Sequence, residues 1–213
     1  MRKGILTASN FKRVYTRMQT LEKDPHASPA ALLELLMGEK PINGTSIPAP
    51  LKWGQDNEAE ARAMYFQVEK KKHKQLHINE AGLLVEKDTL YLGCSADGVV
   101  TCSCPGHRKR LIEIKCPYAL RDGTPKDAAK ERGCTKQNGL WILKQSSNYY
   151  TQIQGQLGIS KFQKCDLVIY TRRGIHVIPV EFNEEFFQDL KQRLVLFYSE
   201  YMFPALLAKW AGN

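Results

Sequence analysis

The chain has 213 residues, which suits one α/β domain with a sizeable core or two small domains. A hydrophobic share of 43% argues against a disordered chain, and a net charge of +9 favours a polyanionic partner, nucleic acid before a membrane surface. No apolar run approaches the roughly 20 residues of a membrane span, and the N-terminus lacks a secretory signal, so we expect an intracellular protein without a membrane partner, nuclear in a eukaryote and cytoplasmic in a bacterium or phage.

The first third of the chain is predicted to be helical. Residues 28–38 form a short helix, with Ser28 as its N-cap and Gly38 just past its end. Residues 41–50 are rich in Pro, Gly and Asn, and they indicate a loop. Residues 51–72 contain no proline and a composition that favours a long helix.

The middle of the chain is predicted to form a sheet. Six segments have strand patterns: 83–86, 90–94, 98–102, 110–115, 165–171 and 175–181. We expect hairpins between the first two and between the last two, and we expect the middle two to pair. Between the fourth and the fifth of these segments, residues 146–160 have helical periodicity.

The C-terminal segment is predicted to be an amphipathic helix. Its apolar residues recur at helical spacing: Phe187, Leu190, Leu194, Phe197 and Tyr201. Strands bracketed by helices predict an α/β fold of a single domain, with a mixed central β-sheet flanked by helices. We divide this domain, 1–213, into an N-terminal helical part (1–75), a sheet core (80–181) and a C-terminal helix (183–210).

Two acids and a lysine form the chemically most informative pattern. Glu113 and Lys115 are two apart in a predicted strand, so both project to one face, while Ile114 lies between them. Asp97 sits in a turn before the strand that should pair with theirs. Two converging carboxylates suit Mg²⁺ or Mn²⁺, and a neighbouring lysine suits phosphodiester hydrolysis. On the bare pattern, a solvated surface Glu–Lys pair is the alternative.

Five motifs follow one another between residue 2 and about residue 202. In chain order they are RKGILTAS, WGQDNEAEAR, CSADG, LIEIKCPY and YYTQIQGQL. Together they resemble the lambda-exonuclease-like, YqaJ-like viral recombinase group of the PD-(D/E)xK nucleases. Ala96 stands where the group has a proline. The resemblance implies a restriction-endonuclease-like core.

The resemblance assigns metal ligands and a catalytic lysine. It implies that Asp97 and Glu113 bind two divalent ions together with the carbonyl of Ile114. It implies that Glu58 completes the second metal site, although an exposed ion pair with the next turn of its helix is the alternative. Lys115 would position the attacking water.

The same resemblance assigns residues that contact the substrate. Gln152 would support the lysine or the substrate, and Tyr149 would contact DNA. Arg2, Ser9 and Ser95 would bind the terminal 5′-phosphate. Ser9 is also a candidate helix N-cap, a role compatible with anion binding.

We therefore expect a Mg²⁺- or Mn²⁺-dependent DNA exonuclease that acts in recombination, repair or viral-type DNA processing. It would digest double-stranded ends 5′→3′ with a preference for 5′-phosphate. Its expected partners are double-stranded DNA ends and a single-strand annealing or recombination protein, and the resemblance implies a ring-shaped homotrimer. The alternatives are a nicking or structure-specific endonuclease of the same fold and a DNA-end-binding accessory without turnover.

A second cluster of ligand-type residues lies in the loop before the catalytic strand. Its members could hold a structural Zn²⁺: Cys102, Cys104, His107 and Cys134. The alternative is that they are free thiols and a solvated histidine. His73 and His77 have ligand spacing on a helix, but we expect both to be surface histidines.

Overall fold

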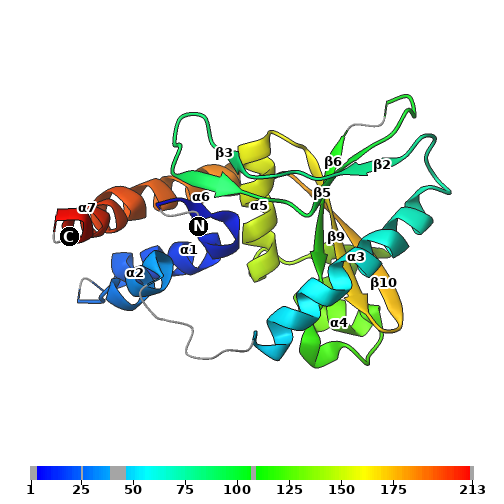
Figure 1. The fold of residues 1–213 in the computed structure, drawn as a ribbon, viewed down its shortest axis with the longest axis horizontal. Coiled ribbons are helices and arrows are strands. Elements are labelled where there is room, and N and C mark those ends of the chain that lie inside the picture. The colour runs from blue at the N-terminus through cyan, green and yellow to red at the C-terminus, as the bar shows by residue number, and fades with distance from the viewer. Residues whose placement is uncertain (1–3, 25, 39–46, 107–108, 212–213) are drawn as a thin grey trace.

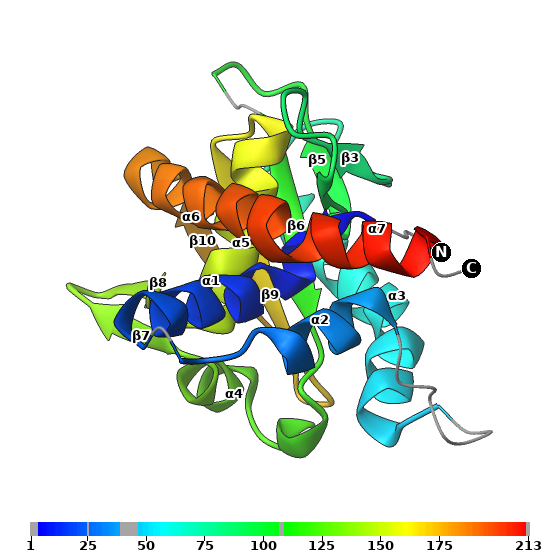
Figure 2. The ribbon, with the colours of Figure 1, turned by 90° about the vertical axis from the view of Figure 1, so that its left-hand side faces the viewer.

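The computed structural model describes residues 4–24, 26–38, 47–106 and 109–211. Its helices lie on both sides of a twisted sheet (Figures 1 and 2). The helices are α1 (Ala8–Lys23), α2 (Ala30–Met37), α3 (Ala49–Glu69), α4 (Pro125–Glu131), α5 (Asn148–Ser160), α6 (Glu184–Phe197) and α7 (Phe203–Ala211). No helix in these ranges is long and apolar enough to cross a membrane.

A five-stranded sheet forms the centre of the molecule. Its order is β10 (Gly174–Glu181), β9 (Lys164–Thr171), β6 (Arg110–Lys115), β5 (Gly98–Thr101) and β2 (His77–Asn79). Strands β6 and β9 are parallel, and the other neighbours are antiparallel, so the sheet is mixed. Two smaller sheets accompany it: β1 (Leu6–Thr7) with β4 (Leu92–Cys94) and β3 (Leu84–Val85), and β7 (Cys134–Gln137) with β8 (Leu140–Leu143).

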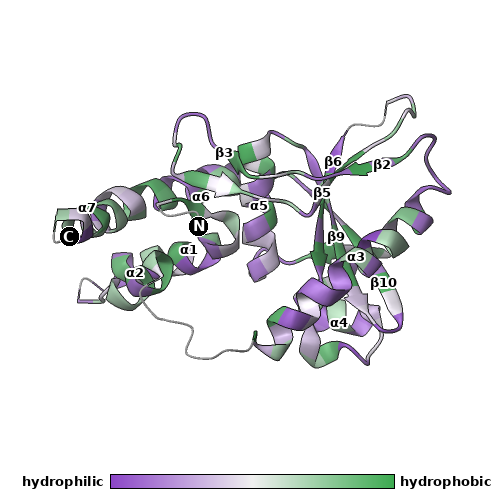
Figure 3. Ribbon diagram, viewed as in Figure 1, coloured by the Kyte–Doolittle hydropathy of each residue, from purple (hydrophilic) through white to green (hydrophobic). Residues whose placement is uncertain are grey.

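Helices α5 and α3 cover opposite faces of the central sheet (Figure 1). Leu111 of β6 packs in a core cluster with residues of α5, whereas its neighbour Ile112 packs in a cluster with residues of α3. Because side chains alternate along a strand, Glu113 and Lys115 share the α5 face with Leu111. Figure 3 shows many hydrophilic residues along α3, which buries only a narrow stripe.

Two glycines let α5 lie close to its neighbours. A Cβ added at Gly155 would collide with the ring of Phe11 in α1, and one at Gly158 would collide with the ring of Phe187 in α6. Any larger residue would force these aromatic rings aside. The glycines thus fix the distance from α5 to α1 and α6, and through it the position of the side chains that α5 presents to the sheet.

The predicted mixed α/β architecture is confirmed. Strands β3 and β4, β5 and β6, and β9 and β10 pair as expected, and Gly38 ends α2 with a left-handed φ of 71°. Details differ at the ends of helices. Thr7, rather than Ser9, is the N-cap residue of α1. The C-terminal helix is interrupted by a π-helical turn at Tyr198–Met202.

Candidate active site

The β5–β6 hairpin brings Asp97 to the middle of β6. The backbone N–H of Asp97 donates to the carbonyl of Ile112 at 3.1 Å, and Asp97 Oδ2 accepts from the N–H of Ile114 at 2.6 Å. These two bonds hold the Asp97 carboxylate beside the strand that carries Glu113 and Lys115. The predicted convergence of Asp97 with the Glu–x–Lys strand is what the structure shows.

Glu113 is almost fully buried, with 2% of its surface exposed, and it is held by three side chains. Its Oε1 lies 2.6 Å from Lys115 Nζ and accepts from Gln152 Nε2 at 2.5 Å. Its Oε2 accepts from Gln156 Nε2 at 2.7 Å. A buried carboxylate is costly unless it is paired and hydrogen-bonded. Here a cation and two amides satisfy it, and both amides come from α5.

Gln156 was not among the residues that the sequence assigned to the site. It lies one helical turn after Gln152, and the i,i+4 spacing places both amides on the face of α5 that meets β6. That spacing was the available signal. The intervening Gln154 points elsewhere, because its amide donates to the carbonyl of Glu181.

The surroundings of Asp97 and Lys115 shift the pKa of both groups. Burial raises the pKa of Asp97 to about 7, and the negative charge of Glu113 adds to this rise, while the N–H of Ile114 and the charge of Lys115 oppose it. Burial alone would lower the pKa of Lys115, but the adjacent Glu113 carboxylate outweighs it and keeps that pKa raised. A half-buried acid next to a buried one favours binding of a cation.

Glu58 lies in the middle of α3 and forms the ion pair that its sequence suggested. Its Oε1 is 2.8 Å from the guanidinium of Arg62, one turn further along the helix. Its charge nevertheless contributes to raising the pKa of both Asp97 and Cys116, after burial as the first cause. Glu58 is therefore within electrostatic reach of the acid pair, on the α3 side of the sheet.

A cavity of about 560 Å³ lies between α1 and the start of α5, and Gln152, which donates to Glu113, is part of its lining, whereas Asp97 and Glu113 are not. It is lined by the sequence-assigned residues Ser9, Tyr149 and Gln152, and by basic side chains of α1 that include Lys12 and Arg17. Ser9 is exposed in the first turn of α1. The basic wall of this cavity suits a polyanion that reaches the carboxylates.

The remaining residues that the sequence assigned to the site lie near the acid pair or outside the described residues. The carbonyl of Ser95 accepts from Gln156 at 3.3 Å, so Ser95 lies near the acid pair, but it does not line the cavity. Lys115 Nζ lies 5.4 Å from the centroid of the Tyr149 ring. Arg2 and His107 lie outside the described residues.

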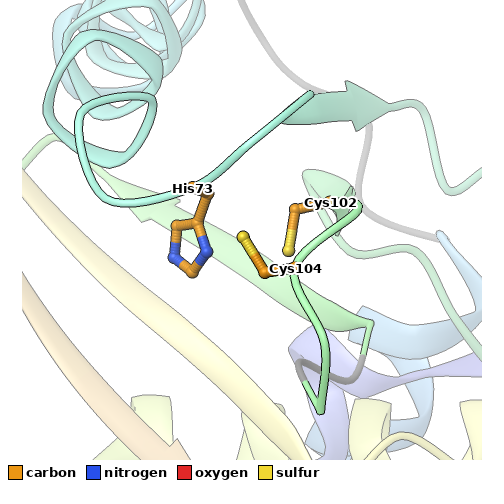
Figure 4. A group of neighbouring side chains, drawn as sticks. All are labelled: His73, Cys102 and Cys104. Atoms are coloured by element: carbon orange, nitrogen blue, oxygen red, sulfur yellow. The ribbon is translucent and has the colours of Figure 1, made fainter.

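The structure groups the candidate zinc ligands differently from the prediction. Figure 4 shows Cys102 and Cys104, just after β5, pointing toward His73, just after α3, and the ligand atoms of these three residues lie within 4.8 Å of one another. Cys134 does not belong to this group. It is buried in β7 within the apolar cluster under α5, where burial raises the pKa of its thiol to about 11. His73 is not a surface histidine, because only 11% of its side chain is exposed.

A family model for the YqaJ-like viral recombinase domain matches residues 1–163. The chain belongs to this family. No curated protein sequence matches the chain significantly.

Solved structures show the same fold as this family member. The structure of an alkaline exonuclease from Laribacter hongkongensis has a TM-score of 0.67 at 23% identity, and its complex with dAMP has a TM-score of 0.69 at 23% identity. Each comparison covers 99% of this chain and 94% of the other. A phage-related exonuclease from Haemophilus somnus 129PT has a TM-score of 0.61 at 10% identity, over 97% of this chain and 96% of the other. At these identities the likeness establishes the fold.

Proposed function

We propose that this protein is a divalent-metal-dependent DNA exonuclease. The observation that carries the proposal is the buried Glu113 carboxylate, which is held by Lys115 and two α5 amides beside a second, half-buried acid, Asp97. A structural ion pair would not need a second carboxylate, whose pKa is raised by burial and by the charge of the first. The exonucleases that share the fold support the same activity.

The acid pair fits a hard divalent cation such as Mg²⁺ or Mn²⁺. Asp97 and Glu113 would supply carboxylate oxygens, and the backbone carbonyl of Ile114, the residue after Glu113, is a third candidate ligand. Glu58 is the candidate for a second ion or for water bound to it. A divalent ion held there would activate a water molecule and offset the charge that develops on the phosphate.

Lys115 and the two glutamines have separate roles in this proposal. Lys115 is a donor that can hold the attacking water and the negative charge of the phosphate, once its contact with Glu113 is exchanged for substrate. Gln152 lines the cavity and also touches Glu113, so it can reach both substrate and ligand. Gln156 is itself buried and donates to Glu113 and to the carbonyl of Ser95, so it would orient the Glu113 carboxylate.

The cavity beside α1 is the proposed path of the DNA strand. Lys12, Arg13 and Arg17 line it, and phosphates would bind there without regard to sequence. Ser9, at the start of α1, and Ser95, two residues before Asp97, are the proposed 5′-phosphate ligands, together with Arg2. A terminal phosphate held this close to the acids favours 5′→3′ digestion.

Linear and closed-circular duplex DNA, incubated with Mg²⁺, test the proposal. The expected result is digestion of the linear DNA alone, faster on 5′-phosphorylated than on 5′-hydroxyl ends. Cleavage of both forms would indicate an endonuclease, and cleavage of neither would indicate a binding accessory. Equal rates on the two kinds of end would contradict the proposed 5′-phosphate site but not the exonuclease activity.

We also propose a ring-shaped homotrimer that works beside a single-strand annealing or recombination protein. A ring around DNA would let one enzyme remove many nucleotides in each encounter. Sedimentation velocity should give three chains per particle. A monomer at working concentration would contradict the ring.

A further inference from the structure

A histidine and two cysteines converge at the end of the sheet remote from Asp97. The ligand atoms of His73, Cys102 and Cys104 lie within 4.8 Å of one another (Figure 4). In a tetrahedral zinc site the ligand atoms are about 3.5 to 3.8 Å apart, as bonds of about 2.0 to 2.3 Å require. Shifts of about an ångström or less in these side chains would therefore complete such a site.

The backbone already fixes two of the three ligands relative to one another. Lys74, directly after His73, donates its N–H to Cys104 Sγ at 3.1 Å, and its carbonyl accepts from the N–H of Ser103 at 3.0 Å. A backbone N–H that points at sulfur stabilises the thiolate form, which is the form that binds metal. The antiparallel pairing of β2 with β5 further holds the segment after His73 beside the strand that precedes Cys102.

The histidine is oriented as zinc-binding histidines are. In Figure 4 one ring nitrogen of His73 faces the sulfurs and the other points away. Nε2 lies 3.3 Å from Glu69 Oε2, and Glu69 is itself buried and held by Arg110 at 2.8 Å. A proton on Nε2, donated to Glu69, leaves the lone pair of Nδ1 for a metal, which is the carboxylate–histidine–metal arrangement. Arg110 also lies 3.4 Å from Nε2. Arg110 carries only donors, so it cannot accept a proton from Nε2. With a metal on Nδ1, the Nε2 proton would therefore be donated to Glu69.

We propose that His73, Cys102 and Cys104 bind one Zn²⁺ ion, with water in the remaining position. Two thiolates and one imidazole are soft and borderline ligands that select zinc over magnesium, and two thiolates would neutralise the charge of the ion. The site would join the end of α3 to the end of β5. By linking these elements, the ion would fasten the helix that carries Glu58 to the strand that begins beside Asp97.

A disulfide between Cys102 and Cys104 is the competing use of the same sulfurs. The histidine, its carboxylate partner and the N–H aimed at Cys104 favour zinc, because a disulfide uses none of them. Neither sulfur forms a disulfide in the structure.

Metal analysis of the full chain, purified under reducing conditions without a chelator, tests the site. About one zinc per chain is expected. Cobalt added to zinc-stripped protein should give the near-ultraviolet charge-transfer band of thiolate ligands, a readout that needs no variant to fold. Cys104→Ser should lower the zinc content about tenfold or more. His77→Ala, which removes a nearby exposed histidine, and Asp97→Ala, which alters the acid pair, should leave the zinc content unchanged.

Thermal unfolding separates this ion from any ion at the acid pair. After chelation the melting temperature should fall, and Zn²⁺, but not Mg²⁺, should restore it. Absence of zinc together with absence of the cobalt–thiolate band would overturn the proposal. So would a Cys102–Cys104 disulfide in the purified protein, or a zinc content that Cys104→Ser leaves unchanged in a folded variant.

Discussion

The two ends of strand β5 present opposite kinds of ligand chemistry. Just before the strand, Asp97 meets Glu113 and Lys115, which offer hard oxygens and a cation. Just after it, Cys102 and Cys104 meet His73, which offer sulfur and nitrogen. The strand has four residues, so Asp97 and Cys102, which flank it, are separated by about 16 Å of extended chain. One short hairpin thus supports a site suited to Mg²⁺ and a site suited to Zn²⁺.

The two sites also differ in how they are held. The acid site depends on a helix from a distant part of the sequence, because α5 supplies the amides that satisfy Glu113. The sulfur site depends instead on backbone groups, through the contacts of Lys74 with Ser103 and Cys104. A change in the packing of α5 should therefore disturb catalysis and leave zinc in place. Variants in and around the two sites test this separation.

Loss of the lysine should have the largest effect. Lys115→Ala should reduce the rate of cleavage about 10²- to 10³-fold or more, because a donor that stabilises charge in the transition state is removed. Duplex binding should change little, since backbone contacts are spread over many basic residues. Single-turnover cleavage and a filter-binding assay measure the two effects. Lys130→Ala, in an exposed ion pair of α4, is the control. Full activity in Lys115→Ala would contradict the assignment of this strand.

Loss of an orienting amide should have a smaller effect. Gln156→Leu keeps the side-chain volume but removes the donor to Glu113 Oε2, and it should weaken metal affinity or activity about 10- to 100-fold. The concentration of Mg²⁺ needed for half-maximal cleavage should rise. A purely structural role would lower the melting temperature and leave that concentration unchanged.

A methyl group at the contact between α5 and α1 should act through stability. Gly155→Ala should cost about 1 to 3 kcal/mol of unfolding free energy, because its Cβ collides with Phe11. Gly54→Ala in α3 meets nothing and should stabilise by about 0.5 to 1 kcal/mol. Denaturant unfolding gives both values. If Gly155→Ala released zinc as readily as it weakened cleavage, the two ends of β5 would not be independent.

Loss of one basic residue of the cavity should have the smallest effect. Arg17→Gln should weaken duplex binding and lower the slope of log K against log salt by about one. Lys87→Gln, at an exposed position outside the cavity lining, should leave the slope unchanged. Binding isotherms at several salt concentrations measure it. An unchanged slope in Arg17→Gln would contradict a DNA path along α1.

Local signals in the sequence predicted most of the fold and the centre of the site. Period-two strands and the Glu–x–Lys spacing are local, so Glu113 and Lys115 could be placed on one face before any packing was known. The hairpin of β7 and β8 carries an Asn138–Gly139 turn with positive φ at both residues, a strong signal that was overlooked.

Contacts between distant segments could not be predicted in the same way. Cys134 is only 30 residues after Cys104, but it enters a different apolar cluster, whereas His73 reaches the sulfurs through the pairing of β2 with β5. Likewise, nothing in the sequence near Glu113 shows that two glutamines of α5 will satisfy its carboxylate. These partners depend on tertiary packing.

The most direct test of the central claim is single-turnover cleavage of a linear duplex by Glu113→Gln over a range of Mg²⁺ concentrations. The substitution keeps the shape of the side chain and removes the charge that pairs with Lys115 and would bind the metal. The account predicts a folded protein that still binds DNA and zinc but does not cleave at any Mg²⁺ concentration. Cleavage at the wild-type rate would contradict it, because the buried carboxylate would then be only a structural ion pair.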